Sequence, residues 1–127
     1  MRKAALAAIL AATAVAAFSA ASCAPEPPAT DPIGRGRQVY RDLGCASCHE
    51  SNLLNFFRPI GPPLEHIGTV AESRRPGTSA GEYVRQSVAD PGSFVVPGYP
   101  DSMPRGVADR ISKEDLDALV AYLLSLR

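Results

Sequence analysis

The chain has 127 residues, of which 46% are hydrophobic and 20% are charged, and its formal net charge is zero. This composition fits one small globular domain. Because there is no basic excess, nucleic-acid binding is excluded as the main function.

Residues 1–22 have the pattern of a bacterial export signal. Arg2 and Lys3 precede an alanine-rich apolar stretch, and small residues follow it up to Ser22. We predict that this segment directs export and takes no part in the fold. An uncleaved membrane anchor and a plain secretory signal are the alternatives, since the apolar run is barely long enough to span a bilayer. In each case the folded domain lies outside the cytoplasm.

Cys23 follows this segment directly, in a context that resembles the lipobox of bacterial lipoproteins. The resemblance implies that its thiol is acylated and that the lipid attaches the protein to a membrane. Residues 23–33 are rich in proline, which favours an extended spacer. We therefore expect a folded domain of residues 34–127 on a proline-rich tether, in the periplasm or at the outer face of the cytoplasmic membrane.

The first helix is expected over residues 34–43. Its apolar side chains Val39, Tyr40 and Leu43 recur at helical intervals, with polar residues between them. Gly44 is expected to end this helix.

Residues 45–49, Cys-Ala-Ser-Cys-His, have the spacing of a covalent haem attachment site. In such a site both thiols add to the haem vinyl groups, and the adjoining imidazole reaches the iron. A disulfide oxidoreductase would need a thioredoxin-like βαβ pattern, and β-rich alternating stretches are absent. A structural zinc site would need four ligands, and beyond Cys45, Cys48 and His49 the chain offers only His66. We predict one covalently bound haem c.

Two long stretches, residues 50–63 and 69–79, are expected to be loops without regular structure. A haem would give such loops an apolar object to cover. Without it, so small a helical domain has little core, and we expect the apoprotein to be largely unfolded. The side chains expected to line the haem are Leu53, Leu54, Phe56, Phe57, Ile60, Leu64, Phe94, Val95, Val96 and Tyr99.

A second helix is expected over residues 80–89. Tyr83, Val84 and Val88 share one of its faces, and the sequence Asp-Pro-Gly at residues 90–92 is expected to stop it. The pattern predicts a helix with one buried face.

Met103 is the only methionine beyond the export segment. It lies between Pro100 and Pro104 in a polar, conformationally restricted loop, whereas a methionine that fills a core gap usually lies on an apolar helix face. A thioether ligand to haem iron raises its reduction potential. We therefore predict Met103 as the second axial ligand, with His66 as the less favoured candidate.

The last helix has the clearest boundary signals. Ser112 is expected to cap its N-terminus, with Asp115 three residues further on. Acidic residues in the first turns suit the helix dipole. The expected core face consists of Leu116, Leu119, Val120, Leu123 and Leu124.

From about Ile33 to Arg127 the chain resembles a class I c-type cytochrome. In that family a glycine and an aromatic residue four apart precede the haem motif, here Gly36 and Tyr40. The last helix crosses this first segment and also carries an aromatic residue, here Tyr122. A Gly-Pro-x-Leu segment follows the haem motif, here residues 61–64.

The resemblance implies an all-α cytochrome c fold, in which three to five short helices and long proline-rich loops wrap around one covalently bound haem c. It implies that the Pro62 carbonyl accepts a hydrogen bond from the far ring nitrogen of His49. That bond would fix the tautomer and orientation of the imidazole. Leu64 and Tyr99 are expected to contact the haem.

Within the family, residues 82–104 look most like the cytochrome c domain fused to subunit II of caa-type haem–copper oxidases. They also resemble small lipoprotein cytochromes of bacterial respiratory complexes. The copper-binding domain of that subunit is not expected in this protein. Lys113 is the one lysine beyond the export segment, which puts docking through a lysine patch in doubt. The chain also has scattered arginines, and we interpret them as a solvated face, with a docking surface for acidic partners as the alternative. They are Arg35, Arg37, Arg41, Arg74 and Arg75.

These features predict an electron carrier, or an electron-transfer subunit of a larger complex, and not an enzyme. With His49 and Met103 on the iron, no position is open for oxygen or substrate. The expected partners are membrane complexes of a respiratory or photosynthetic chain: a quinol-oxidising complex, a terminal oxidase or a photosynthetic reaction centre. The alternative is a haem enzyme, or a gas or redox sensor, in which the sixth ligand is labile.

Overall fold

The computed structural model describes residues 29–50 and 60–127. These residues form helices and turns and contain no strand, which confirms the expected all-α class. The export segment, Cys23 and the first part of the tether lie outside the described residues. None of the helices in the described part is long and apolar enough to cross a membrane. The elements are α2 (Pro32–Asp42), α3 (Ala46–His49), α4 (Ile67–Arg74), α5 (Ala80–Ala89), η1 (Pro91–Ser93), η2 (Ala108–Arg110) and α6 (Lys113–Ser125).

Helix α2 starts two residues before the expected position. The Asp31 carboxylate accepts a hydrogen bond from the Gly34 N–H at 2.8 Å, which caps the helix, and Pro32 occupies the first turn. Pro32 and Ile33 therefore belong to the helix and not to the tether. The helix ends before Gly44, whose φ of 70° lies in the left-handed region that glycine adopts without strain.

Helix α6 agrees with the sequence pattern. The Ser112 hydroxyl oxygen accepts the Asp115 N–H at 3.1 Å and caps the helix. Leu119, Val120 and Leu123 are buried. The expected neighbours Leu116 and Leu124 are partly buried and pack against the same core.

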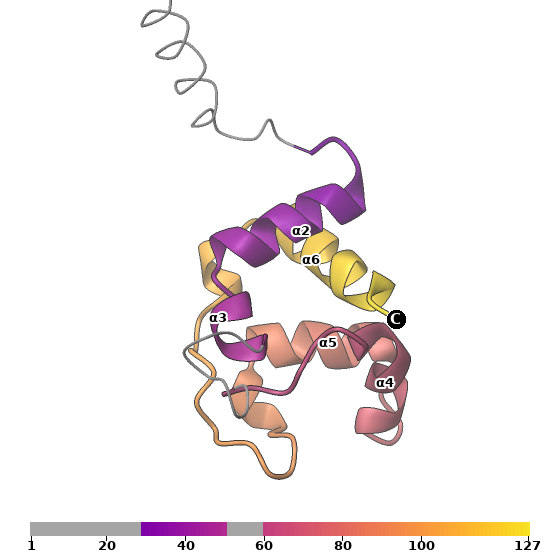
Figure 1. Cartoon of the computed structure of the whole chain (residues 1–127), viewed down its shortest axis with the longest axis vertical. Helices are drawn as coiled ribbons and strands as arrows, with labels where there is room; N and C mark the ends of the chain where they lie inside the picture. Colours follow the sequence, from indigo (N-terminus) through magenta and orange to yellow (C-terminus); the bar gives the residue numbers. More distant parts are fainter. Residues whose placement is uncertain (1–28, 51–59) are drawn as a thin grey trace, which may run out of the picture.

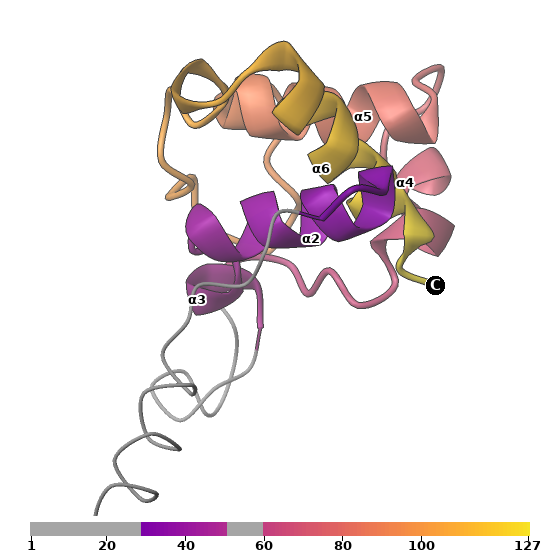
Figure 2. The ribbon, with the colours of Figure 1, turned by 90° about the horizontal axis from the view of Figure 1, so that it is seen from above.

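Helices α2 and α6 cross each other (Figures 1 and 2). A Cβ atom on Gly36 would lie 2.0 Å from the Ala118 carbonyl oxygen, so only glycine lets the two backbones approach this closely. Beside this contact, the Tyr40 and Tyr122 rings meet edge to face with centroids 5.6 Å apart. The Arg35 guanidinium also forms an ion pair with Asp115 at 2.7 Å, which joins α2 to α6.

Helix α4 corrects the expectation of a structureless loop over residues 69–79. Its sequence has little amphipathic periodicity, so its pattern did not indicate a helix. Tertiary packing forms it instead: Ala71 is fully buried, and the Gly68 N–H donates to the Leu126 carbonyl at 2.8 Å at the end of α6. A Cβ on Gly68 would lie 2.1 Å from the Leu124 oxygen. Residues 75–79 remain a loop, as expected.

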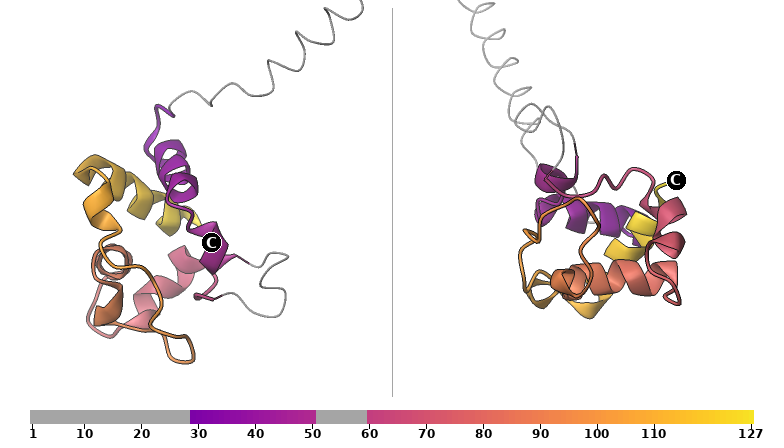
Figure 3. Two further views of the ribbon diagram at one scale, coloured as in Figure 1. Left: turned by 90° about the vertical axis from the view of Figure 1, so that its left-hand side faces the viewer. Right: turned by 90° about the horizontal axis from the view of Figure 1, so that it is seen from below.

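Helix α5 has the expected bounds and is capped by the Ser79 hydroxyl, which accepts the Glu82 N–H at 3.3 Å. Between α5 and α6 the chain forms a long loop with the single turns η1 and η2, drawn in orange in Figure 3. We call residues 90–107 the methionine loop. Its neck is closed by Arg105, whose guanidinium lies 2.7 Å from Asp101 and 3.7 Å from Asp90.

Candidate functional site

The two thiols of the haem motif lie at a very short helix. Cys45 precedes α3 and Cys48 lies within it, and both are free, half-buried thiols. Burial raises the pKa of the Cys45 thiol, and the charge of Cys48 adds to this effect. A protonated thiol is less prone to oxidation than a thiolate. This effect keeps the Cys45 sulfur available for thioether formation.

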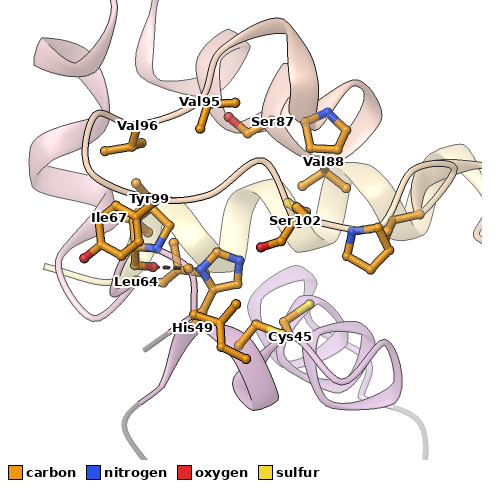
Figure 4. A pocket seen from close by; sticks show the side chains of 18 of the residues that line it. Cys45, His49, Leu64, Ile67, Ser87, Val88, Val95, Val96, Tyr99 and Ser102 are labelled. Atoms are coloured by element: carbon orange, nitrogen blue, oxygen red, sulfur yellow. Dashed lines mark hydrogen bonds between the residues drawn. The ribbon is translucent and has the colours of Figure 1, made fainter. Parts of the chain in front are cut away.

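The imidazole of His49 is held by backbone groups that come after the haem motif. Its Nδ1 lies 2.7 Å from the Pro62 carbonyl oxygen, where the ring N–H donates, so Nε2 is left with its lone pair (Figure 4). The contact that the resemblance implied is present in the structure. A Cβ on Gly61 would lie 2.7 Å from the ring, so the peptide packs directly on the imidazole. The Gly61 N–H also donates to the Cys48 carbonyl at 2.8 Å.

A second contact fixes α3 to the first helix. The Tyr40 hydroxyl donates to the Glu50 carboxylate at 3.0 Å, directly after α3. Burial, followed by this carboxylate, raises the pKa of Tyr40, so the phenol stays protonated at all ordinary pH values. The Cys45 N–H donates to the Tyr40 carbonyl at 3.2 Å. The haem motif is thus tied to the α2–α6 crossing.

One cavity brings the expected site residues together. Cys45 lines it from the N-cap of α3, Cys48 and His49 line it from α3 itself, and Met103 lines it from the methionine loop. Figure 4 shows His49 projecting into the space below the strip of loop that carries Val95, Val96 and Tyr99. The further expected lining residues that border this cavity are Ile60, Pro62, Leu64, Phe94, Val95, Val96 and Tyr99.

Other expected lining residues cannot be placed in this way. Leu53, Leu54, Phe56 and Phe57 lie outside the described residues. His66, the less favoured ligand, is exposed at the start of α4 and does not line the cavity. Within the described ranges, no group of three or more His, Cys, Asp or Glu side chains is arranged to bind a metal.

The sequence did not indicate where two arginines near this cavity lie. Arg74 was assigned to a solvated face, but it is half-buried and lines the cavity. Arg105 was not singled out, although it closes the neck of the methionine loop. The direction of Arg74 depends on α4, which had no clear signal in the sequence.

The side chains of this cavity fit a covalently bound haem. Two thiols lie three residues apart, an imidazole with a fixed tautomer lies beside them, and a thioether comes from a different element. The remaining wall is mostly apolar, formed by residues such as Val88, Phe94 and Val95. One wall position holds a buried arginine nitrogen, Arg74 Nε, that has no hydrogen-bond partner within residues 29–50 and 60–127. A helical domain with this cavity is a c-type cytochrome by fold and by donor set.

Comparison with known proteins agrees. The family model described as Cytochrome c matches residues 33–127. The chain therefore belongs to the cytochrome c family, whose members bind covalently attached haem c and transfer electrons. This result confirms the predicted fold and cofactor.

A curated relative is similar over most of the chain. Cytochrome c oxidase subunit 2 of Alkalihalophilus pseudofirmus is 29% identical over 106 residues, which cover 80% of this chain. The same stretch covers 28% of that protein, so this chain matches about a quarter of the length of its relative.

Proposed function

We propose that the protein carries single electrons between membrane redox complexes, with His49 and Met103 as the axial ligands of its haem iron. The observation that supports this most directly is the composition of the lining of one cavity. It contains the two thiols, an imidazole whose Nδ1 is occupied by Pro62, and the sulfur-bearing side chain of Met103.

Each residue has a separate task in this proposal. Cys45 and Cys48 fix the cofactor to the chain through thioether bonds, in which each S–H adds across a vinyl group. Pro62 holds the His49 ring so that Nε2 faces the cofactor, and the hydrogen bond increases the basicity of the ring. Haem c, when bound, supplies an iron that alternates between the ferric and ferrous states by one electron. Met103 would supply the second iron ligand, which would leave no position open for oxygen or substrates.

The methionine ligand can be tested on the purified holoprotein. Met103→Ala should abolish the methionine–iron charge-transfer band of the ferric protein and lower the reduction potential, since a thioether favours ferrous iron. Ser102→Ala, at the neighbouring position, serves as the control and should keep the band. An unchanged band in Met103→Ala would assign the ligand to another group. Ready binding of carbon monoxide by the native ferrous protein at neutral pH would favour the sensor or enzyme alternative.

We further propose that the domain works at the outer face of the cytoplasmic membrane. Three features support this: the export pattern of residues 1–22, the lipobox-like context of Cys23 and the proline-rich spacer after it. A tether would raise the local concentration of the domain near membrane partners. Mass spectrometry of the mature N-terminus tests the anchor. A lipid mass on Cys23 is expected, and an unmodified N-terminus elsewhere would contradict it.

The proposed partners are an electron donor and an acceptor in the membrane. The name of the relative, cytochrome c oxidase subunit 2, favours a terminal oxidase as acceptor. A quinol-oxidising complex would be the matching donor, and a photosynthetic reaction centre is the alternative partner. Co-purification from solubilised membranes, followed by mass spectrometry and a haem spectrum, identifies the partners. Recovery of the cytochrome free of any redox complex would count against a fixed subunit.

A further inference from the structure

Arg105 connects the two ends of the methionine loop. Its guanidinium pairs with Asp101 at 2.7 Å, so Met103 lies midway in sequence between the two members of one ion pair. A second, longer contact of 3.7 Å joins the same guanidinium to Asp90, directly after α5. One side chain therefore links the segment that carries the thioether to the helix from which the loop starts.

The space that this guanidinium occupies is left open by a glycine. A Cβ on Gly92 would lie 1.8 Å from Arg105 Nη1 and 2.4 Å from its Cζ, so the guanidinium packs directly on the Gly92 backbone. Gly92 lies in the turn η1, next to the buried Pro91. The Asp90 N–H donates to the Gln86 carbonyl of α5 at 2.7 Å. Arg105 thus packs on a part of the loop that is itself fixed to the helical core.

The segment around Met103 has little support of its own. Asp101, Ser102 and Met103 form no backbone–backbone hydrogen bond within residues 29–50 and 60–127. Pro104, which follows, has no N–H to donate. The ion pair with Arg105 is the polar contact that the described residues provide to this segment. In such irregular chain, a few side-chain contacts decide how easily the segment opens.

We propose that Arg105 is a positioning residue for Met103, which packs on Gly92 and slows the departure of the thioether from the iron. Met103 lines the cavity, whereas the exposed Arg105 does not, so Arg105 acts on the ligand through the loop. The inference rests on the proposed function, because it requires Met103 to be the second axial ligand.

The expected size of the effect follows from the exposure of these groups. A loop ligand leaves the iron when the loop opens locally, so contacts that exist only in the closed loop slow this step. Ion pairs between exposed side chains stabilise weakly, which corresponds to about a two- to fivefold change in the rate. The charge of Arg105 would also act on the iron directly, since a nearby cation favours the ferrous state. A test must therefore separate position from charge.

Gly92→Ala makes this separation. The variant keeps every charge, but its methyl group takes the place of the guanidinium, which can move into solvent at the end of a long side chain. The φ of Gly92 is not positive, so alanine adds no backbone strain. Gly92→Ala should therefore fold normally, with Arg105 displaced from the loop.

The experiment measures how fast Met103 leaves the iron of the ferric holoprotein. At saturating cyanide, the rate of cyanide binding is limited by this step. Gly92→Ala and Arg105→Gln should each raise the limiting rate by about two- to fivefold. Gly81→Ala is the matched control and should leave the rate unchanged, because its Cβ would meet nothing closer than the Leu124 side chain at 3.8 Å.

The double variant Gly92→Ala/Arg105→Gln gives the sharpest result. It should react no faster than Arg105→Gln alone, because both changes remove the same contact. A double variant whose effect is the product of the two single effects would overturn the proposal. So would a wild-type rate in either single variant, or an equal rise in Gly81→Ala.

The methionine–iron band of the wild-type ferric protein is recorded first. Its absence would overturn the proposed ligation by Met103. A normal band together with unchanged rates in Gly92→Ala and Arg105→Gln would instead overturn the role of Arg105 and leave the proposed function intact.

Discussion

The α2–α6 crossing and the methionine loop are held together in different ways. On one side, the α2–α6 crossing is closed by the protein's own contacts: the Gly36 backbone packs on Ala118, and the Tyr40 ring packs on Tyr122. On the other side, the methionine loop consists of single turns and irregular chain. Its apolar residues Val95 and Val96 are half-buried and line the cavity.

This difference shows which part of the core the protein completes by itself. The helices bury side chains such as Leu119, which is 1% exposed, against one another. In the methionine loop, apolar side chains line the cavity that fits the haem. The bound cofactor would therefore bury them as core residues bury one another. The stability of the loop should therefore depend on the haem more than the stability of the crossing does.

The largest effect is expected from removing the haem attachment. The double variant Cys45→Ala/Cys48→Ala should lose most of its helical signal in far-UV circular dichroism, because the remaining core is small. Any residual protection in hydrogen exchange should lie in α2 and α6. Cys23→Ser, which removes a thiol outside the folded domain, should keep the haem and the full signal. Full helicity in the double variant would contradict the comparison.

The crossing can be broken without touching the cavity. Gly36→Ala places a methyl group 2.0 Å from the Ala118 oxygen and should lower the free energy of unfolding of the holoprotein by about 1–3 kcal/mol. Gly81→Ala is the matched control, because its Cβ would meet nothing closer than the Leu124 side chain at 3.8 Å. That change should be neutral or stabilise by up to about 1 kcal/mol. Denaturant titration measures both, and equal losses would argue against a backbone contact at Gly36.

A smaller effect is expected at the neck of the methionine loop. Arg105→Gln removes the ion pairs with Asp90 and Asp101, which should loosen the loop and let imidazole compete with Met103 more easily. Exposed pairs contribute about 0.2–1 kcal/mol, so the affinity of the ferric protein for imidazole should rise by no more than about fivefold. Arg85→Gln, which breaks a pair with Asp117 between α5 and α6, should leave this affinity unchanged. An equal rise in imidazole affinity in both variants would contradict a specific role of the Arg105 ion pairs.

The smallest effect concerns acid stability of the crossing. The hydrogen bond from Arg35, supported by Ser112, holds the pKa of Asp115 below its ordinary value in the folded protein. The folded state therefore binds fewer protons, so this contribution is complete above the unfolded pKa of about 3.9 and is lost as pH falls through the folded pKa. Asp115→Asn should lower the melting temperature slightly at pH 6. It should not lower the melting temperature at a pH below the folded pKa of Asp115. A pH-independent difference would exclude the ion pair as its cause.

The sequence predicted those helices that have their own start signals and a periodic apolar face. Ser112 and the leucines of α6 gave both its start and its buried face, and α5 followed its pattern from end to end. Helix α4 was missed because its main determinants are Ala71 and Gly68, small residues whose burial depends on contact with α6. Such residues give no periodic signal, since their role lies in the space they leave for a neighbour.

The candidate site was predictable to a similar extent. Cys45, Cys48 and His49 followed from their spacing, and the contact between His49 and Pro62 followed from the family resemblance. Arg74 could not be found, because its direction is set by α4 and by the chain reversal after it. Sequence alone also does not distinguish it from Arg75, although one faces the cavity and the other faces Gln86.

The backbone contacts around Gly61 have one more consequence. Helix α3 has four residues, too few to keep its own geometry, and both ends of the segment 50–60 are fastened to each other: Gly61 to Cys48, and Pro62 to His49. The orientation of the imidazole therefore depends on these two contacts and not on the number of residues between them. The place of this ligand is then decided by the backbone at Gly61 and Pro62 more than by the short helix that carries it.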